Sequence, residues 1–116
     1  NERRYELIYK NYCKYGSKRA LGFCCSKEHA KDMAVTSTKG ATGHMMGAGG
    51  ITEAIACIQA IREGIVPPTL NLEHLDEACA PLNYVPEEAQ KKEVKAAMSN
   101  SFGFGGQNSS VIFKVY

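Results

Sequence analysis

The sequence has no apolar run that approaches the roughly 20 residues needed to cross a bilayer as a helix. It does not begin with methionine, and no apolar core with a small-residue cleavage site marks a secretory signal. The missing initiator indicates that the amino terminus of the natural protein is absent. Because no apolar run is long enough, we expect no membrane span. Because the chain does not begin with methionine, we draw nothing about targeting from its start.

Paired cysteines with metal or redox spacing are also lacking. The cysteines are odd in number, irregularly spaced and without a CxxC motif: Cys13, Cys24, Cys25, Cys57 and Cys79. This usage favours reduced, intracellular thiols over a disulfide framework. Cys24, Cys25 and His29 are conceivable zinc ligands, but adjacent cysteines rarely both reach one tetrahedral ion and no second ligand pair follows. No metal site is predicted.

The charge is unevenly placed although the net charge is only +2. Residues 1–31 carry eight of the fourteen lysines and arginines, interleaved with Tyr5, Tyr9 and Tyr12 at helical spacing. Such a segment could bind RNA or an acidic protein, or it could be a solvated helix packed on a neighbour. Residues 1–27 stay unassigned, and residues 28–116 are taken as the domain.

Residue patterns in the domain predict alternating strands and helices. Residues 33–38 are expected to form a buried strand, and residues 45–63 a long helix ended by Gly64. Apolar residues at three- and four-residue steps predict one buried stripe on that helix and just beyond it: Ile51, Ala54, Ile55, Ile58, Ile61 and Ile65.

The last third of the chain reads as extended segments. IVPPTLNL is expected to be extended because its two prolines exclude helix, and residues 73–77 to be a loop or short helical turn. Residues 96–102 and 109–116 predict two strands separated by GFGGQN, the second covered on both faces. Together these elements predict an α/β layered domain.

Two glycine clusters lack the spacing of phosphate-binding loops. A Walker loop needs GxxxxGK followed by Ser or Thr, but Lys39 precedes the first cluster. In a dinucleotide fingerprint Gly47 and Gly49 would require Gly or Ala at position 52, which is Thr52. The second cluster, residues 103–108, is followed by no helical pattern. No nucleotide or other cofactor is predicted.

The first cluster, STKGATGHMMGAGG, surrounds one histidine with glycines. Backbone N–H groups at a helix start, and the nearby Lys39, would disfavour a charged ring on His44. A neutral ring can donate one N–H to a carbonyl or a developing oxyanion. The alternative is a histidine that only caps a loop, with glycines that allow tight packing.

The second cluster, SNSFGFGGQN, places Phe104 between glycines on a turn. The flanking glycines would let this ring swing as a gate over a pocket. The alternative is an apolar anchor for the hairpin.

These clusters, together with AIREGIVPPTLNLE and LNYVPEEAQ, closely resemble the carboxyl-terminal part of the β-ketoacyl-acyl-carrier-protein synthases. The resemblance covers about three quarters of the chain, from about residue 28 to residue 116. It implies the carboxyl-terminal half of a thiolase-like, layered αβαβα fold. It also implies an acyltransferase of fatty-acid biosynthesis that condenses malonyl-acyl carrier protein with an acyl-enzyme thioester. EHAKDMAVTSTKGATGH looks most like the mitochondrial and bacterial elongating members, which implies a mitochondrial or cytoplasmic protein.

The resemblance also implies roles for individual residues. His44 matches the second catalytic histidine, which donates a hydrogen bond to the malonyl thioester, and Lys39 matches the active-site lysine. Phe104 matches the gating phenylalanine, whose backbone N–H contributes to the oxyanion hole. The implied substrate-binding residues lie in the strand before Lys39 and around the gate: Thr36, Thr38, Gly103 and Gly105.

Two parts of the family's catalytic set have no counterpart in this sequence. The nucleophilic cysteine belongs to the amino-terminal half, and the first histidine lies in a His-Gly-Thr motif expected just upstream of residue 28. We therefore expect a carboxyl-terminal fragment that is inactive alone and leaves apolar faces uncovered. Acyl carrier protein is the implied partner, homodimers are expected of the full-length enzyme, and no nucleic acid is expected. The alternative is a non-catalytic binding protein that reuses the half-fold, whose binding to acidic acyl carrier protein or RNA would be strongly salt-dependent.

Overall fold

The structure is a computed structural model that describes residues 33–79 and 82–116. Their elements follow in the order α3 (Lys39–Thr42), the 3-10 helix η1 (Met46–Ala48), α4 (Gly49–Glu63), β1 (Ile65–Val66), β2 (Gln90–Lys91), β3 (Ala96–Phe102) and β4 (Asn108–Lys114). The mixture of helix and strand agrees with the predicted α/β class. The unassigned segment 1–27, the boundary at residue 28, and Cys24, Cys25 and His29 lie outside the described residues.

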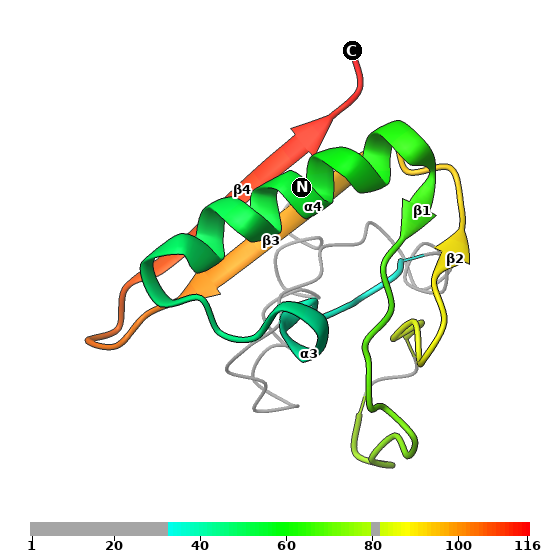
Figure 1. The fold of residues 1–116 in the computed structure, drawn as a ribbon, viewed down its shortest axis with the longest axis horizontal. Helices are drawn as coiled ribbons and strands as arrows, with labels where there is room; N and C mark the ends of the chain where they lie inside the picture. Colours follow the sequence, from blue (N-terminus) through cyan, green and yellow to red (C-terminus); the bar gives the residue numbers. More distant parts are fainter. Residues whose placement is uncertain (1–32, 80–81) are drawn as a thin grey trace, which may run out of the picture.

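The carboxyl-terminal hairpin is the best predicted part of the fold. β3 and β4 pair antiparallel from Ala96 opposite Lys114 to Phe102 opposite Asn108. Helix α4 crosses this hairpin and packs mainly on β3 (Figure 1). The prediction that the second strand is covered on both faces is wrong for the described residues, since 65% of Ile112 is exposed. A strand needs a packed layer on each side to be covered on both faces, and α4 supplies only one.

Helix α4 begins later than predicted. The chain passes through η1 before α4 starts at Gly49, so the predicted start at residue 45 is wrong. Gly47 lies in the stretch before α4 that does not form an α-helix, and a glycine costs about 1 kcal/mol in a helix relative to alanine. The predicted end is confirmed. Gly64 adopts a left-handed φ of 62°, and its N–H donates to the Ala60 carbonyl.

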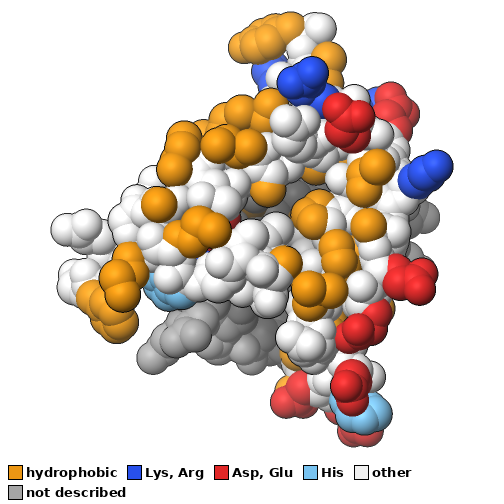
Figure 2. Space-filling model, in the orientation of Figure 1, with side chains coloured by type: hydrophobic (Ala, Val, Ile, Leu, Met, Phe, Trp, Pro, Cys, Tyr) orange, Lys and Arg blue, Asp and Glu red, His pale blue; other side chains and the backbone are white. Residues whose placement is uncertain are grey.

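The isoleucines of α4 and its carboxyl-terminal end are mostly exposed, so the predicted buried stripe is wrong for the described residues. Ile51 is 64% exposed and Ile55 53%, whereas Ala60 is buried on the opposite side. Figure 2 shows hydrophobic side chains gathered over α4 and β4 on the face in view. The spacing of the isoleucines does mark one apolar face of α4, but no described residue covers that face. The uncovered faces agree with what the resemblance implied.

The segment before α3 has one bridging contact instead of a strand. Residues 33–38 were predicted as a strand, but the structure has only a parallel bridge between Ala34 and Asn83. Val35 N–H donates to the Asn83 carbonyl at 2.8 Å. A ladder requires a partner along its whole length, and among the described residues only Asn83 provides one.

The predicted extended segment IVPPTLNL is extended from Ile65 to Thr69, but Leu70 and Asn71 form a turn in which Asn71 has a positive φ of 64°. β1 pairs antiparallel with β2, and Thr69 forms a parallel bridge with Pro86. Residues 73–77 form bends and turns rather than a helix. Three apolar side chains are buried in the described chain, namely Ala60, Val66 and Val85. No helix among the described residues is long and apolar enough to cross a membrane.

Candidate active site

Lys39 opens the short helix α3, which the sequence analysis did not predict. The carbonyl of Thr38 accepts hydrogen bonds from the N–H groups of Ala41 and Thr42, both at 3.0 Å. The turn closes at Gly43, whose φ of 73° suits glycine and whose N–H donates to the Lys39 carbonyl. One turn of helix therefore fixes the backbone from which the Lys39 side chain extends.

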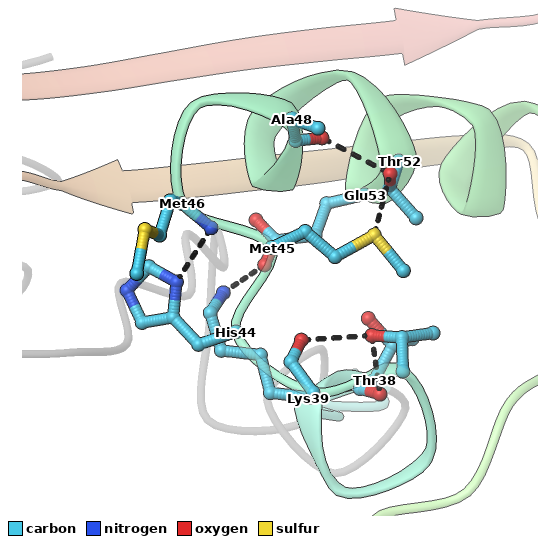
Figure 3. A network of polar contacts seen from close by, with 10 residues as sticks. Thr38, Lys39, His44, Met45, Met46, Ala48, Thr52 and Glu53 are labelled. Carbon is cyan, nitrogen blue, oxygen red and sulfur yellow. Dashed lines mark hydrogen bonds and ion pairs between the residues drawn. The ribbon is translucent and has the colours of Figure 1, made fainter.

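The Lys39 ammonium forms an ion pair with the carboxylate of Glu53, which lies in the second turn of α4 (Figure 3). The Glu53 side chain is only 17% exposed, while that of Lys39 is 44% exposed. Sequence reasoning missed Glu53. One available signal was that it is the only acidic residue between positions 33 and 62, in a helix otherwise rich in apolar residues.

His44 lies in the loop between α3 and η1 and is exposed. Its Nδ1 accepts a hydrogen bond from the Met46 backbone N–H at 3.0 Å. A nitrogen that accepts carries no proton, so this bond places the ring proton on Nε2. Figure 3 shows the ring turned toward the Met46 backbone while Lys39 reaches toward Glu53.

The surroundings of His44 in the structure differ from those that the sequence analysis assumed. α4 starts five residues after His44, and a helix dipole acts mainly within the first turn. The charge of Lys39 is also offset by Glu53. The hydrogen bond from the Met46 N–H to Nδ1 instead favours the tautomer that is protonated at Nε2. Met46 itself has a positive φ of 48°.

The loop that carries His44 is tied to α4. The Thr52 hydroxyl lies 3.0 Å from the Ala48 carbonyl and 3.3 Å from the Met45 sulfur (Figure 3). Gly50, two residues before Thr52, lies close to the end of β3, because a Cβ there would be 3.9 Å from the Ser101 hydroxyl. The two glycine clusters therefore meet at one end of the domain.

Phe104 occupies the tip of the turn between β3 and β4 and is fully exposed. Gly103 N–H donates to the Gln107 carbonyl at 2.7 Å, and Gly105 and Gly106 have left-handed φ angles of 87° and 81°. The ring cannot anchor the hairpin by burial, so the anchor interpretation is wrong for the described residues. Of the other implied substrate-binding residues, Thr36 and Thr38 precede α3 and are half-buried.

Cys57 follows Glu53 by one helical turn on α4. Burial, and secondarily the Glu53 carboxylate, raises the pKa of the Cys57 thiol above its ordinary value. Cys57 lies within α4, and Cys79 is an exposed loop residue. Neither stands at a helix start, where a thiolate nucleophile is favoured. In residues 33–79 and 82–116 no three His, Cys, Asp or Glu side chains gather as metal ligands.

The raised pKa of Cys57 predicts slow alkylation. Only the thiolate reacts, so at pH 8 we expect iodoacetamide to label Cys57 at least about tenfold more slowly than the exposed Cys79. Replacing Glu53 with Gln removes the negative charge that raises the pKa, and should speed labelling of Cys57 but not of Cys79. Peptide mass spectrometry measures both rates. Equal rates in the unmodified protein would contradict the assigned environment.

Comparison with known proteins identifies the family. The family model described as the carboxyl-terminal domain of β-ketoacyl synthase matches residues 18–73. The 3-oxoacyl-[acyl-carrier-protein] synthase 2 of Synechocystis sp. is 50% identical over 85% of this chain and 22% of its own length. The same-named protein of Coxiella burnetii is 49% identical over 73% of this chain and 20% of its own length.

A solved structure extends the comparison to the fold. A type II polyketide ketosynthase, determined with its acyl carrier protein, has a TM-score of 0.71 and 30% identity over 78% of this chain and 22% of its own. The predicted fold class, part of a thiolase-like layered fold, is confirmed by this likeness. The chain spans about a fifth of the length of the curated relatives it matches. By sequence and by structure, this chain belongs to the β-ketoacyl synthase family and carries its carboxyl-terminal domain.

Proposed function

We propose that the natural protein carrying this sequence is a 3-oxoacyl-acyl-carrier-protein synthase of fatty-acid biosynthesis. The observation that carries the proposal is the tautomer of His44. Its Nδ1 is occupied by the Met46 N–H at 3.0 Å, which leaves an exposed Nε2–H free to donate to a substrate oxygen. The family membership supports the same reaction.

In the proposed decarboxylation, His44 Nε2–H donates to the carbonyl oxygen of the malonyl thioester. The bond between the malonyl carboxylate and its neighbouring carbon breaks, and carbon dioxide leaves. The electron pair passes into the thioester as an enolate, whose negative oxygen the Nε2–H stabilises. The enolate carbon then attacks the acyl thioester on a cysteine, and the cysteine sulfur leaves.

The proposed role of Lys39 is electrostatic. Its pairing with Glu53 fixes a cation on the helix that precedes His44, and offsets the carboxylate that α4 would otherwise present. We propose that Thr36 and Thr38, in the segment before α3, contribute to substrate binding. Gly103 and Gly105 are assigned to the backbone around the gate.

The proposed partner is acyl carrier protein loaded with malonyl or acyl groups. The names of the curated relatives and the carrier protein bound to the polyketide ketosynthase support this choice. Homodimerisation of the full-length enzyme stays a proposal. We also propose a reducing compartment, the cytoplasm or the mitochondrion, in keeping with the free thiols of Cys57 and Cys79. No observation favours the non-catalytic alternative.

Condensation tests the proposed function. The natural protein is incubated with acyl-acyl carrier protein and malonyl-acyl carrier protein, and the products are analysed by mass spectrometry. We expect a 3-oxoacyl thioester on the carrier protein together with release of carbon dioxide. Salt-dependent binding of the carrier protein without any product would instead favour the binding alternative.

Phe104 provides a separate prediction, because its ring is fully exposed. Replacing it with Ala should change the free energy of unfolding by no more than about 0.5 kcal/mol, yet lower the condensation rate about tenfold if the ring gates the site. Phe102, at the half-buried end of β3, is the matched control. Phe102→Ala should destabilise the fold. Loss of stability in Phe104→Ala, or an unchanged condensation rate, would contradict the gate.

A further inference from the structure

The hydroxyl of Thr69 joins three separate parts of the chain. Its Oγ1 donates to the Tyr84 carbonyl at 2.8 Å and accepts the Ser37 N–H at 3.3 Å. It also lies 3.4 Å from the Thr36 hydroxyl. A hydroxyl has one proton and two lone pairs, so these contacts use its whole hydrogen-bonding capacity. Such a side chain fixes its neighbours in direction as well as in distance.

The backbone of Thr69 is held as firmly as its side chain. Its N–H donates to the Val85 carbonyl at 2.7 Å, and its own carbonyl accepts the Glu87 N–H at 3.4 Å. Val85 is completely buried with a positive φ of 47°, which is unfavourable for a β-branched residue. A conformation of this kind persists only where surrounding contacts over-determine it.

Those surrounding contacts form a small polar network. Asn83 Oδ1 accepts the Val85 N–H at 3.1 Å, and Asn83 Nδ2 donates to Gln90 Oε1 at 2.7 Å. Asn83 also receives Val35 N–H at its backbone carbonyl. Thr69 is therefore hydrogen-bonded to residues 83–90, a segment that is itself held by this network.

Thr69 and Leu70 contact the chain on both sides of Lys39. Ser37, which donates to Thr69, lies two residues before Lys39. Gly40, directly after Lys39, packs against Leu70, the residue that follows Thr69. A Cβ at Gly40 would lie 3.2 Å from the Leu70 carbonyl oxygen and 3.3 Å from the Leu70 Cβ. The backbone of Lys39 is thus held between consecutive contacts to Thr69 and Leu70.

We propose that Thr69 is a positioning residue that aims Lys39 at Glu53 and so sets the electrostatics beside His44. This inference rests on the proposed decarboxylation and adds to it a residue outside both glycine clusters. Thr69 acts through the backbone of residues 36–40 and touches no reacting atom. Misplacement of a catalytic group by a fraction of an ångström lowers a rate without loss of substrate binding.

Two variants of Thr69 in the natural protein test the inference. Thr69→Val keeps the shape and removes the hydroxyl, and should lower kcat for malonyl decarboxylation about tenfold with KM unchanged within about twofold. Thr69→Ser keeps the hydroxyl and should restore kcat to within about threefold of the unmodified protein. Ser110→Ala is the control, since it removes a hydroxyl bonded to Asn100 on the hairpin, away from Lys39, and should change neither constant.

A second variant and a second readout keep the test decisive if Thr69→Val folds poorly. Gly40→Ala should push α3 away from Leu70 and give the same fall in kcat with KM unchanged. Amide hydrogen exchange at Ser37 should accelerate in Thr69→Val and stay slow in Thr69→Ser.

The two failures are distinguishable. The positioning role is overturned if Thr69→Val decarboxylates like the unmodified protein, or if Thr69→Ser is no faster than Thr69→Val. It is also overturned if Ser37 exchanges at the same rate in both variants. An unmodified protein that does not decarboxylate malonyl-acyl carrier protein overturns the proposed function instead, and the Ser37 exchange rates then still decide whether the Thr69 contact orders the segment before Lys39.

Discussion

Replacing His44 with Ala should lower the rate of malonyl decarboxylation about a thousandfold, equivalent to about 4 kcal/mol of transition-state stabilisation. The variant removes the Nε2–H, which we propose donates to a substrate oxygen from a ring held by the Met46 N–H. The fold should survive, because His44 is exposed and its one hydrogen bond lies within a loop. The measurement is the rate of carbon dioxide release from malonyl-acyl carrier protein.

Amide replacements of His44 separate a donor at Nε2 from a donor at Nδ1. The Gln side chain can place an N–H₂ group near the position of Nε2, whereas the shorter Asn reaches only the position of Nδ1. We therefore expect His44→Gln to recover part of the rate and His44→Asn to recover none. His74, an exposed histidine in the loop after β1, is the matched control, and His74→Ala should decarboxylate normally. Undiminished decarboxylation by His44→Ala would show that the assignment is wrong.

Breaking the ion pair between Lys39 and Glu53 should lower kcat/KM about a hundredfold, the second largest effect we expect. Lys39→Met removes the cation that pairs with the Glu53 carboxylate, beside the loop that carries His44. The Glu53 side chain is only 17% exposed, so water compensates little for the loss. Glu53→Gln leaves the ammonium without its anchor. Because the two side chains act as a unit, the double variant should be little worse than Lys39→Met alone.

Exposed charges elsewhere provide the control for this cycle. Lys95 and Glu93 lie 4.0 Å apart with side chains more than four-fifths exposed. Lys95→Met and Glu93→Gln should leave kcat/KM unchanged. The stability effect of the Lys39–Glu53 pair should also be small, about 1 kcal/mol or less, since Lys39 is partly exposed. Fully additive losses of activity in the Lys39 and Glu53 variants would contradict a coupled role.

Local sequence patterns predicted the elements that depend on local chemistry. The β-branched and aromatic run of residues 111–116, separated from residues 96–102 by GFGGQN, led to the hairpin of β3 and β4. Gly64 led to the end of α4 because a left-handed cap favours glycine. The start of α4 was misplaced, since the chain forms the 3-10 helix η1, which contains Gly47, before α4 begins.

Properties that depend on distant residues were not predictable in the same way. The isoleucine spacing of α4 defines which face is apolar, but not what lies against it, so Ile51 and Ile55 were predicted buried and are exposed. Only the fold brings Glu53 to Lys39 across fourteen positions. The positive φ of the buried Val85, whose carbonyl accepts the Thr69 N–H, is not indicated by any local sequence pattern either.

The candidate site was found from the sequence through its glycines and one histidine. His44, Lys39 and Phe104 were all singled out there, and the structure adds their surroundings. The tautomer of His44 depends on a hydrogen bond to Met46 that no spacing rule predicts. The roles of these residues stay predictions until a reaction is measured.

The most direct test of the decarboxylase assignment is the intact mass of malonyl-acyl carrier protein after incubation with the natural protein, without any acyl donor. In the proposed mechanism this half-reaction uses His44 and Lys39 and forms no bond to the cysteine. We predict loss of carbon dioxide and protonation of the resulting enolate carbon by water, which together convert the malonyl group to acetyl, and no conversion by His44→Ala. Malonyl-acyl carrier protein that keeps its full mass would contradict the proposed function.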